Sequence, residues 1–555
     1  MAIYTTLPWH IQEVDVIIAG GGIAGCIVAS RLADADPELS ILIIESGRDN
    51  YNVPTVNHPV LWRGNYVPDD PRVFFHKAVK EEQLADRESI AQVGNTLGGG
   101  SSINLMMYTR AQQCDYNSWN TEGWTADDLL PYLKKFETYH GLRGKDHHGY
   151  NDPIQVSDGP FCSTKADDDF IAALEEVGYH EVEDLQDFNS VSVARGRKYV
   201  FPEGKRQDVA NTYLHPRLQD GKHPNLHVLV ESQVIRVIFD NNRASGVEFR
   251  PNPALQPNPV QGARTVKARK LVVISCGTLG TPPILERSGI GNPDILERAS
   301  IATPPIADLL GVGHDYQDHN ISIYTYKADL PPDMTTDGIH SGQVDISALL
   351  ESKNKILGWN GIDVWSKLRP TSFRTWDRDF NDPSKPLVTG IFITGLLGNR
   401  SRVPPGQYIS VGVYTAYPYS WGHVHITGRS MDDRLDFKTG YLSDNFDLDL
   451  KGEVSYRHPV FPPESKASYA YDTPKGSATP NMTTCWHGIG TCKMAPREQL
   501  GVVDNNLGVY GVRGLKVADL SIIPENVCAN TMNTALTIGE KAADIIIQEL
   551  SLTQQ

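Results

Sequence analysis

The chain has 555 residues, of which 40% are apolar, and a formal net charge of −16. This length predicts two domains, or one large two-lobed unit, rather than a single small core. The acidic balance argues against nucleic acid or an anionic membrane as a partner, because both would repel the protein. The composition is ordinary for a soluble globular enzyme and is compatible with a small-molecule substrate.

The cysteines and the two ends of the chain bear on the compartment. The seven cysteines are scattered and lack metal-type pairing, which predicts reduced thiols inside a cell. No basic segment precedes the first apolar run, residues 16–29, so we expect no signal peptide. This run is also shorter than the roughly 20 residues of a membrane span. The C-terminal tripeptide is not a peroxisomal signal. We therefore expect an intracellular, most simply a cytoplasmic, protein.

The segment 14–46 has the pattern of a dinucleotide-binding unit. Residues 14–19 are typical of a strand buried on both faces, and residues 24–32 and 41–44 predict the next helix and strand. Glycines spaced as G-x-G-x-x-G allow a tight turn, a close approach of backbone to a pyrophosphate and close packing of the helix. An acidic residue after the second strand accepts hydrogen bonds from a ribose. The expected ligands are Gly20, Gly22, Gly25 and Glu45.

A second glycine-rich run follows at Leu97–Asn104. Its three glycines and two serines carry almost no side chain, so their backbone could lie directly against a flat or anionic ligand. A flexible linker has a similar composition. Because the apolar segment 103–108 begins within this run, a packed loop is the favoured interpretation.

Paired histidines, His147 and His148, stand in a glycine-rich loop that we expect over residues 141–152. Adjacent histidines can ligate a metal, but no third ligand stands at a useful spacing in the sequence. Solvated loop histidines are therefore the favoured interpretation, and we expect no metal site.

The middle of the chain repeats the glycine pattern. Residues 270–275 predict another buried strand, residues 276–282 a glycine turn and residues 283–288 a helix. Because this unit lies far from the first one in sequence, we expect the dinucleotide-binding lobe to be discontinuous. Further helices are expected at 127–136 and 167–177, and strands at 153–156, 225–230, 234–239 and 244–250.

The pattern changes between residues 312 and 481. Short strands stand between proline-rich loops without regular helices, as in the antiparallel sheet of a second, substrate-binding lobe. The expected strands are 321–326, 387–394, 407–416 and 423–427. A strand at 515–517 and a long helix at 534–550 return to the style of the first lobe.

Five motifs in a fixed order give a resemblance that runs nearly end to end. Beside the first glycine motif they are LGGGSSIN at 97–104, GTLGTPPILERSGIG at 277–291, HGIGTCKM at 487–494 and the closing segments 517–519 and 530–541. The sequence resembles the glucose–methanol–choline (GMC) family of flavin oxidoreductases, and within it the fungal alcohol (methanol) oxidases. This resemblance implies FAD as the cofactor, whereas the spacing alone indicates only a dinucleotide.

The resemblance also implies which residues hold FAD. The first glycine motif and Glu45 would bind its ADP part, and residues 97–104 would lie along the flavin and the pyrophosphate. Val234 would offer its backbone near the adenine. Asp519, with the helix entered after Asn533, would close over the phosphates and the ring. The implied cofactor-binding residues are Gly20, Gly22, Gly25, Glu45, Leu97, Gly99, Ser101, Ser102, Asn104, Val234, Asp519 and Thr531.

The active-site pair of the family matches His487 and Asn530. Oxidation of an alcohol removes a proton from its oxygen and a hydride from the adjacent carbon. A neutral imidazole at His487 would accept the proton as a general base, and the amide of Asn530 would donate to the developing alkoxide. A hydrogen-bonded core histidine and a turn asparagine before a helix cap are the alternatives, which the HGIGT context disfavours.

Two departures from the family pattern bear on the substrate. Methanol-oxidising relatives tend to carry an aromatic residue just after SSIN, where this chain has Leu105. Residues 424–484 also look shorter than in those oxidases, with a helical piece missing around 447–453. Both departures put methanol in doubt: they would open the pocket to larger alcohols, or remove a surface used for assembly. Trp486 is expected to pack beside the base.

The expected fold class is α/β, with a discontinuous Rossmann-type FAD-binding domain and a second, α+β substrate domain built on an antiparallel sheet. The FAD-binding domain is expected at 1–152, 205–311 and 488–555. The substrate-binding domain is expected at 153–204 and 312–487.

The leading functional hypothesis is FAD-dependent oxidation of a primary alcohol to an aldehyde, with dioxygen as the acceptor and hydrogen peroxide as a product. A dehydrogenase with another acceptor and an oxidase that tailors a secondary metabolite are rivals on the same scaffold. A lyase that holds FAD structurally and a binding or scaffold protein are rivals of other classes. Nucleic acid and membrane are not expected as partners, and a homo-oligomer stays an open alternative.

Overall fold

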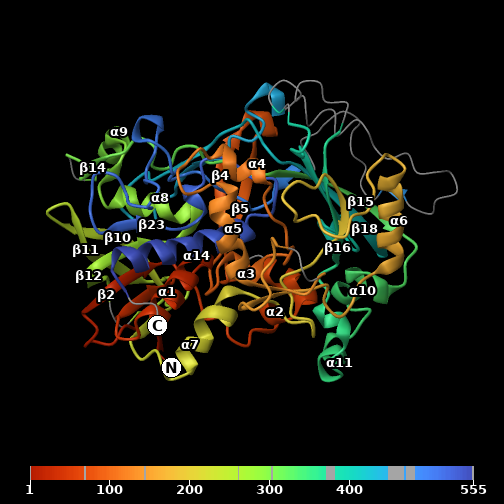
Figure 1. The fold of residues 1–555 in the computed structure, drawn as a ribbon, viewed down its shortest axis with the longest axis horizontal. Helices are drawn as coiled ribbons and strands as arrows, with labels where there is room; N and C mark the ends of the chain where they lie inside the picture. Colours follow the sequence, from red (N-terminus) through yellow and green to blue (C-terminus); the bar gives the residue numbers. More distant parts are fainter. Residues whose placement is uncertain are drawn as a thin grey trace.

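The computed structural model shows two β-sheets toward opposite ends of the molecule, with helices and long loops between and around them (Figure 1). This mixed arrangement confirms the α/β fold class. The region 448–453, where the sequence indicates a missing helical piece, lies outside the described residues. The structure describes residues 2–67, 70–142, 146–259, 262–301, 304–370, 380, 382–447, 468–469 and 482–552.

The first sheet has eight strands and contains the first glycine motif at its edge. In spatial order its strands are β1 (Ile3–Tyr4), β9 (Leu226–Leu229), β3 (Ile41–Ile44), β2 (Glu13–Ala19), β12 (Arg264–Ile274), β11 (Arg243–Pro251) and β10 (Ser232–Asp240), with β23 (Leu515–Val517) also paired to β12. Neighbouring strands pair in parallel along the spatial order β1, β9, β3, β2 and β12, and β23 also pairs in parallel with β12. Their carboxyl ends therefore meet along one edge, where open parallel sheets bind ligands.

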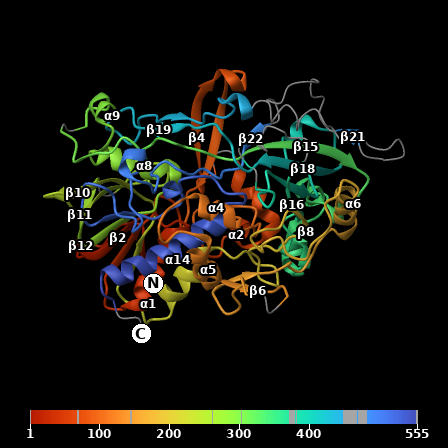
Figure 2. The ribbon, with the colours of Figure 1, turned by 45° about the horizontal axis from the view of Figure 1, so that its top comes forward.

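Burial explains the strands and helices of this lobe. β3 is buried along its whole length, and so are the last four residues of β2, as expected of apolar runs in a parallel sheet. Helix α1 (Ile23–Ala35) follows the glycine turn, and the last helix, α14 (Met532–Glu549), lies along it (Figure 2). A Cβ atom on Gly539 would lie 3.0 Å from the Cα of Ala24, so the two helix backbones approach closely. The C-terminal helix thus packs in the same lobe as the N-terminal helix.

The second sheet is antiparallel, as expected for the region after residue 312. In spatial order its strands are β21 (Ser468–Tyr469), β15 (Asn320–Ala328), β18 (Gln407–Thr415), β17 (Val388–Ile393), β16 (Ile362–Leu368) and β8 (Ser192–Arg195), with β22 (Met482–Thr484) also paired to β15. Helix α6 (Thr164–Glu175) packs beside β8 and β16. The sequence pattern did not predict β16 or β8.

A hairpin of β4 (Val73–Glu81) and β5 (Arg87–Gly94) stands between the two sheets (Figure 1). Charged side chains interrupt both strands, so their pattern does not alternate cleanly and the sequence did not predict them. Ala78 and Ala91 anchor the hairpin in a small core of their own with side chains of the second lobe.

Most other expected elements appear within a few residues of their predicted ends. Helix α8 (Gly277–Arg287) begins earlier than expected, directly at the glycine turn. The region expected to lack helices contains two short ones, α10 (Thr336–His340) and α11 (Ile346–Glu351). In the described part of the chain, every helix is too short or too polar to span a bilayer. The remaining α-helices and β-strands of the described residues are α2 (Pro54–Asn57), α3 (Gly100–Ile103), α4 (Gln113–Ser118), α5 (Ala126–Lys135), α7 (His215–Gln219), α9 (Pro293–Arg298), β6 (Glu137–Tyr139), β7 (Ile154–Val156), β13 (Ile290–Gly291), β14 (Ala307–Asp308), β19 (His423–His425) and β20 (Asp436–Lys438).

An ion pair between Arg31 and Glu540 fastens α1 to α14. The guanidinium donates to the Glu540 carboxylate at 2.8 Å, and the Tyr213 hydroxyl donates to it at 2.6 Å. Glu540 is fully buried, and its second cation, Lys135, lies farther away at 3.4 Å and is partly exposed, so loss of Arg31 leaves a poorly compensated carboxylate inside the protein. We predict that Arg31→Ala lowers the free energy of unfolding by about 3 kcal/mol, measured by chemical unfolding of the holoenzyme.

The exposed pair of Arg269 with Asp15 provides the matched control for this prediction. Arg269 donates to Asp15 at 2.9 Å, but almost half of its side chain is exposed to solvent. Arg269→Ala should therefore cost less than about 1 kcal/mol. Equal losses in the two variants would contradict the role given to Arg31.

Candidate active site

A cavity of about 690 Å³ lies between the two sheets. The turn between β2 and α1, the second glycine run and the start of α8 form its wall on the side of the first lobe. Strands β15, β17 and β18 of the second lobe, the hairpin, and the loops that contain His487 and Asn530 form the rest. The cavity therefore brings together segments from almost the full length of the sequence.

The first glycine turn is built by backbone contacts. Gly20 has a φ of +97°, and a Cβ atom there would lie 2.3 Å from the carbonyl oxygen of Ser275. A Cβ atom on Gly25 would lie 2.2 Å from the carbonyl oxygen of Gly20. These two glycines are thus required by the protein itself. A Cβ atom on Gly22, in contrast, would have its nearest neighbour 3.8 Å away, so this backbone faces open space in the cavity.

The second glycine run lies directly on the first. The Gly98 amide donates to the Gly21 carbonyl at 2.8 Å, and a Cβ atom on Gly99 would meet the Cα of Gly22 at 3.0 Å. The Ser101 and Ser102 hydroxyls donate to carbonyl oxygens within the same run, at 2.6 and 2.7 Å. These serines hold the shape of the loop, and the packed-loop interpretation is confirmed.

Two buried carboxylates at the sheet edge also hold backbone. Glu45 accepts from the Gly21 and Gly47 amides at 2.8 Å each. Asp519 accepts from the Gly277 amide at 2.9 Å and from the Thr281 hydroxyl at 2.6 Å, which ties the C-terminal segment to the start of α8. Burial raises the pKa of both carboxyl groups, against the hydrogen bonds that stabilise their charged forms. Both residues also line the cavity.

The sequence-predicted residues fall into two groups, those that line the cavity and those that lie behind its surface. Among the described residues, those that line it include Gly20, Gly22, Glu45, Gly99, Asn104, Leu105, Val234, Trp486, His487, Asp519, Asn530 and Thr531. Gly25, Leu97, Ser101 and Ser102 lie behind this surface and support it. For both groups, the assigned role in binding or catalysis stays a prediction.

His487 and Asn530 meet at the cavity wall, although they stand 43 positions apart in the sequence. The Asn530 Nδ2 lies 3.2 Å from the Nε2 of His487. Thr109 fixes the orientation of this amide: its hydroxyl donates to Asn530 Oδ1 at 3.1 Å and accepts from the Asn530 main-chain amide at 2.8 Å. The NH₂ end of Asn530 therefore points toward His487 and the cavity.

The electrostatics of His487 suit proton acceptance. Its side chain is 8% exposed, and burial lowers the pKa of the imidazole well below its ordinary value; a positive charge on His319, present only when that ring is protonated, would lower it further. A lowered pKa means that the imidazole is neutral at neutral pH. It can then accept a proton and does not have to lose one first.

Three residues around this pair were not predicted: Thr109, Asp318 and His319. Asp318 accepts from the main-chain amide of His487 at 2.9 Å, and His319 Nδ1 lies 2.9 Å from His487 Nδ1. The available signal was an Asp–His pair directly before the apolar strand β15, where charged residues are unusual. Its partner is distant in sequence, so the contact itself could not be inferred.

Leu105 and Trp486 both line the cavity. Leu105 packs with Ile321 and Tyr414 of the second sheet in one apolar cluster. Trp486 stacks on Tyr66 with ring centroids 5.2 Å apart. Its φ of +60° is rare for a bulky residue, so the loop before His487 is held in an unfavourable conformation by its surroundings.

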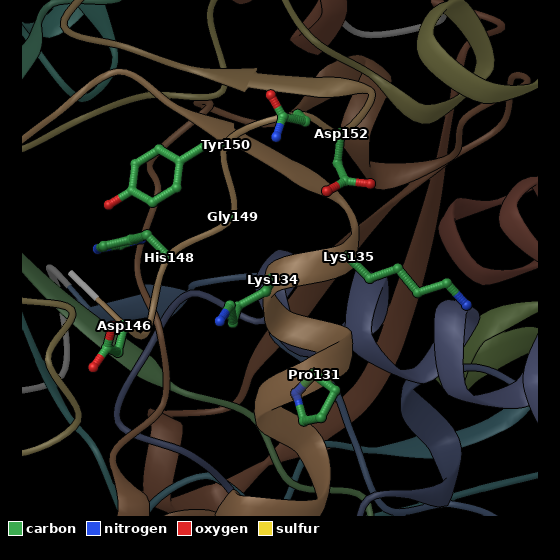
Figure 3. Close-up of a pocket in the computed structure, with 9 residues that line it drawn as sticks. Pro131, Lys134, Lys135, Asp146, His148, Gly149, Tyr150 and Asp152 are labelled. Carbon is green, nitrogen blue, oxygen red and sulfur yellow. The ribbon is translucent and has the colours of Figure 1, made fainter. Parts of the chain in front are cut away.

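The expectation of solvated histidines in the 141–152 loop is wrong for His148. This side chain is fully buried and stacks on Tyr139 at 3.5 Å, beside a smaller hollow lined by residues of α5 and the loop (Figure 3). Its Nδ1 faces Glu137 at 2.9 Å and its Nε2 faces Asp184 at 2.9 Å.

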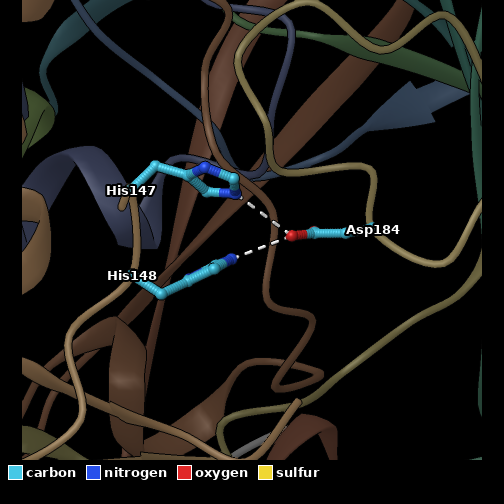
Figure 4. Close-up of side chains that lie close together, drawn as sticks. All are labelled: His147, His148 and Asp184. Atoms are coloured by element: carbon cyan, nitrogen blue, oxygen red, sulfur yellow. Dashed lines mark hydrogen bonds and ion pairs between the residues drawn. The ribbon is translucent and has the colours of Figure 1, made fainter. Parts of the chain in front are cut away.

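Asp184 is the third potential metal ligand that the sequence spacing hid. His147 and His148 both point their Nε2 atoms at its carboxylate (Figure 4). Although burial opposes it, the hydrogen bonds from both imidazoles lower the pKa of Asp184. A carboxylate on each nitrogen of His148 accounts for the burial of this ring without any ion, so we assign the cluster to structure.

Comparisons with known proteins agree with this geometry. The N-terminal model of the GMC oxidoreductases matches residues 14–321 and the C-terminal model matches residues 418–539. The alcohol oxidases of Pichia angusta and Candida boidinii are 35% and 34% identical, over 97% of this chain and 95% of theirs. The first of these alignments runs over 642 positions, so it opens gaps within this shorter chain.

A solved structure shows the same fold. The FAD-dependent oxidoreductase of Chaetomium thermophilum superposes with a TM-score of 0.83 at 24% identity, over 98% of this chain and 100% of the other. Two family models and near-complete relatives above 30% identity are decisive together. The chain belongs to the GMC oxidoreductase family, and its cofactor is FAD.

Proposed function

We propose that this protein is an alcohol oxidase that converts a primary alcohol to an aldehyde and passes the electrons to dioxygen, giving hydrogen peroxide. The observation that carries the proposal is the meeting of His487 and Asn530 at the cavity wall, with one acceptor and one donor nitrogen 3.2 Å apart. The similarity to yeast alcohol oxidases supports the same reaction.

The residues at the sheet edge fit FAD. Gly22, Gly99 and Gly100 present bare backbone to the cavity, and a Cβ atom on Gly100 would meet nothing within 4 Å. The N-terminus of α1 opens onto the same space, where a helix dipole favours phosphate. Glu45 stands at the end of β3, in the position that binds a ribose. We therefore place the pyrophosphate at the glycine turns and the adenosine between Glu45 and Val234.

The substrate oxygen would lie on the cavity side of the two active-site nitrogens, within hydrogen-bond reach of both. Asn530 Nδ2 would donate a hydrogen bond to this oxygen, and His487 Nε2 would accept its proton. A positioned general base of this kind contributes about 10²- to 10⁴-fold to rate. The donor on the other side stabilises negative charge as it develops on the oxygen. Bound FAD supplies the acceptor for the hydride, and the protein supplies position and electrostatics.

The apolar wall beside His487 favours substrates larger than methanol. Leu105, Ile321, Ile323, Ile391 and Leu397 line this part of the cavity together with Tyr414, whose ring lies 5.9 Å from that of His487. Such a wall gives a hydrocarbon chain or an aromatic ring somewhere to lie, whereas a one-carbon alcohol buries almost nothing against it. We propose a longer primary or aromatic alcohol as the substrate.

Other parts of the hypothesis also stand as proposals. The strands of the two sheets support the division into an FAD-binding domain (1–152, 205–311 and 488–555) and a substrate-binding domain (153–204 and 312–487). A dehydrogenase would share every contact described above, so the electron acceptor has to be tested directly. An intracellular location and a homo-oligomer are likewise kept as proposals.

FAD binding should depend on the open space at Gly22. Gly22→Val should fold but purify with little flavin, because its side chain would enter space that the protein leaves open for the pyrophosphate. The ratio of flavin absorbance to protein absorbance measures this. Gly262→Val is the control, since that glycine also has open space around it but lies outside the cavity. Full flavin content in Gly22→Val would refute the assignment of this turn.

Loss of either member of the active-site pair should slow the reaction without loss of the cofactor. His487→Ala and Asn530→Ala should keep FAD but slow its reduction by an alcohol under anaerobic conditions, the former by about 10²- to 10⁴-fold. Stopped-flow bleaching of the flavin spectrum gives the rate. Readmission of air with a peroxide assay then separates an oxidase from a dehydrogenase. An unchanged reduction rate in His487→Ala would show that another group is the base.

The apolar wall also predicts a dependence on chain length. Each methylene that a larger alcohol buries should contribute about 0.8 kcal/mol, or about fourfold in affinity. The wild type should therefore prefer longer or aromatic alcohols over methanol by kcat/KM. Leu105→Phe should shift this preference toward short alcohols by filling the cavity, and Leu105→Met, which keeps a flexible side chain, is the control. An unchanged profile in Leu105→Phe would contradict the role of this side chain.

A further inference from the structure

His319 lies directly behind His487, on the side away from the cavity. Its Nδ1 is 2.9 Å from the Nδ1 of His487, and its Nε2 is 3.0 Å from the carbonyl oxygen of Ala416. The side chain is fully buried, and its ring stacks on Tyr414 with centroids 4.8 Å apart. It is not among the described residues that line the cavity, so it has no direct access to a substrate.

The carbonyl of Ala416 determines where His319 carries its proton. A carbonyl oxygen can only accept, so the Nε2 of His319 must be the protonated nitrogen. Burial lowers the pKa of His319 to about 4, against the opposing effect of hydrogen bonds to the main chain of Ala416 and Val527, and this keeps the ring neutral at neutral pH. A neutral imidazole has a single N–H, and therefore the Nδ1 of His319 is a bare acceptor.

This acceptor in turn determines the tautomer of His487. Two bare nitrogens 2.9 Å apart would repel each other, so the Nδ1 of His487 must carry a hydrogen and donate it to His319. The other nitrogen of a neutral His487, Nε2, is then left without a hydrogen. That nitrogen is the one beside Asn530, at the cavity wall.

We propose that His319 is a positioning residue that holds His487 in the tautomer whose bare Nε2 faces the substrate. This inference rests on the proposed function, in which Nε2 accepts the alcohol proton. The same contact also serves the protonated state: when Nε2 takes up the proton, the Nδ1–H of the imidazolium still donates to His319. The base can therefore change its charge without any movement of its ring.

Asp318, the neighbour of His319 in the sequence, holds a different part of His487. The carboxylate of Asp318 fixes the main chain of His487, and it also accepts from the hydroxyls of Thr484 and of Tyr441. His319 fixes the ring. Two adjacent residues thus hold the backbone and the side chain of the proposed base separately.

Among the described residues, the other titratable groups near the two rings include Asp318 with Tyr316 and Tyr441, which donate to it, and Tyr414 with Cys485 and Cys528 beside it. The Asp318 carboxyl group is engaged by the donors named above. Burial raises the pKa of the Tyr414 hydroxyl and raises that of the Cys528 thiol to about 12, so both are neutral near pH 7. The main-chain amide of Cys485 donates to the carbonyl of His319 at 2.9 Å.

Two substitutions separate hydrogen bonding from packing. His319→Phe keeps a ring that can stack on Tyr414 but removes the acceptor, whereas the amide oxygen of His319→Asn can accept where Nδ1 accepts. The measurement is the anaerobic rate of flavin reduction by an alcohol as a function of pH, with flavin content as the measure of folding. His487→Ala is run in parallel.

His319→Phe should retain flavin and reduce it about 10²-fold more slowly at the pH optimum, as expected when a base loses the group that sets its tautomer. The acid limb of its profile should move to lower pH, because the imidazolium loses the acceptor for its Nδ1–H. His319→Asn should restore the limb and bring the rate within about tenfold of the wild type. A purely structural role would change flavin content and leave the limb in place.

The outcomes distinguish this inference from the proposed function. A wild-type rate and profile in His319→Phe, with a slow His487→Ala, overturns the inference and leaves the base in place. A fast His487→Ala overturns both. If His319→Phe loses its flavin, ¹⁵N NMR of ring-labelled wild-type protein decides, with the His487 signals assigned by their loss in His487→Ala. A protonated Nδ1 supports the inference, and a bare Nδ1 overturns it.

Discussion

The close approach of backbone to backbone at the two glycine runs is the constraint on which the rest of the site depends. Gly98 donates to the carbonyl of Gly21, and Gly99 lies against Gly22 with no room for a side chain. This contact places the second run at the carboxyl edge of the parallel sheet, beside the N-terminus of α1. Leu105 follows that run directly, so the proposed substrate wall is attached to the proposed binding site of the cofactor.

Both lobes contribute residues to the cavity. The last segments of the chain enter the first sheet through β23 and then supply Asn530 and α14, while the second sheet supplies the apolar wall. Asp519 joins the C-terminal segment to the start of α8. Its carboxylate and that of Glu45 accept hydrogen bonds from backbone amides, so both hold the shape of the sheet edge.

The sequence predicts what depends on local pattern and misses what depends on distant partners. Strands β2 and β3, the glycine turn and α14 follow from apolar runs and spacing, and the proposed active-site pair from the resemblance of short motifs to the family. The β4–β5 hairpin has no clean alternation, so its pairing became visible only in the structure. His148 resembles a loop histidine because the two carboxylates that bury it lie elsewhere in sequence. His319 was missed for the same reason.

The pairing of β15 with β22 sets the distance between His319 and His487. Asn320 lies opposite Thr484, and the next hydrogen bond joins the amide of Cys485 to the carbonyl of His319. Because side chains alternate along a strand, a slip of one residue between these strands would turn one imidazole away from the other. The register of β15 against β22 therefore determines whether the two rings face each other. A substitution at Asn320, Ser322 or Met482, the three residues of that ladder that do not line the cavity, can therefore disturb the chemistry from outside it.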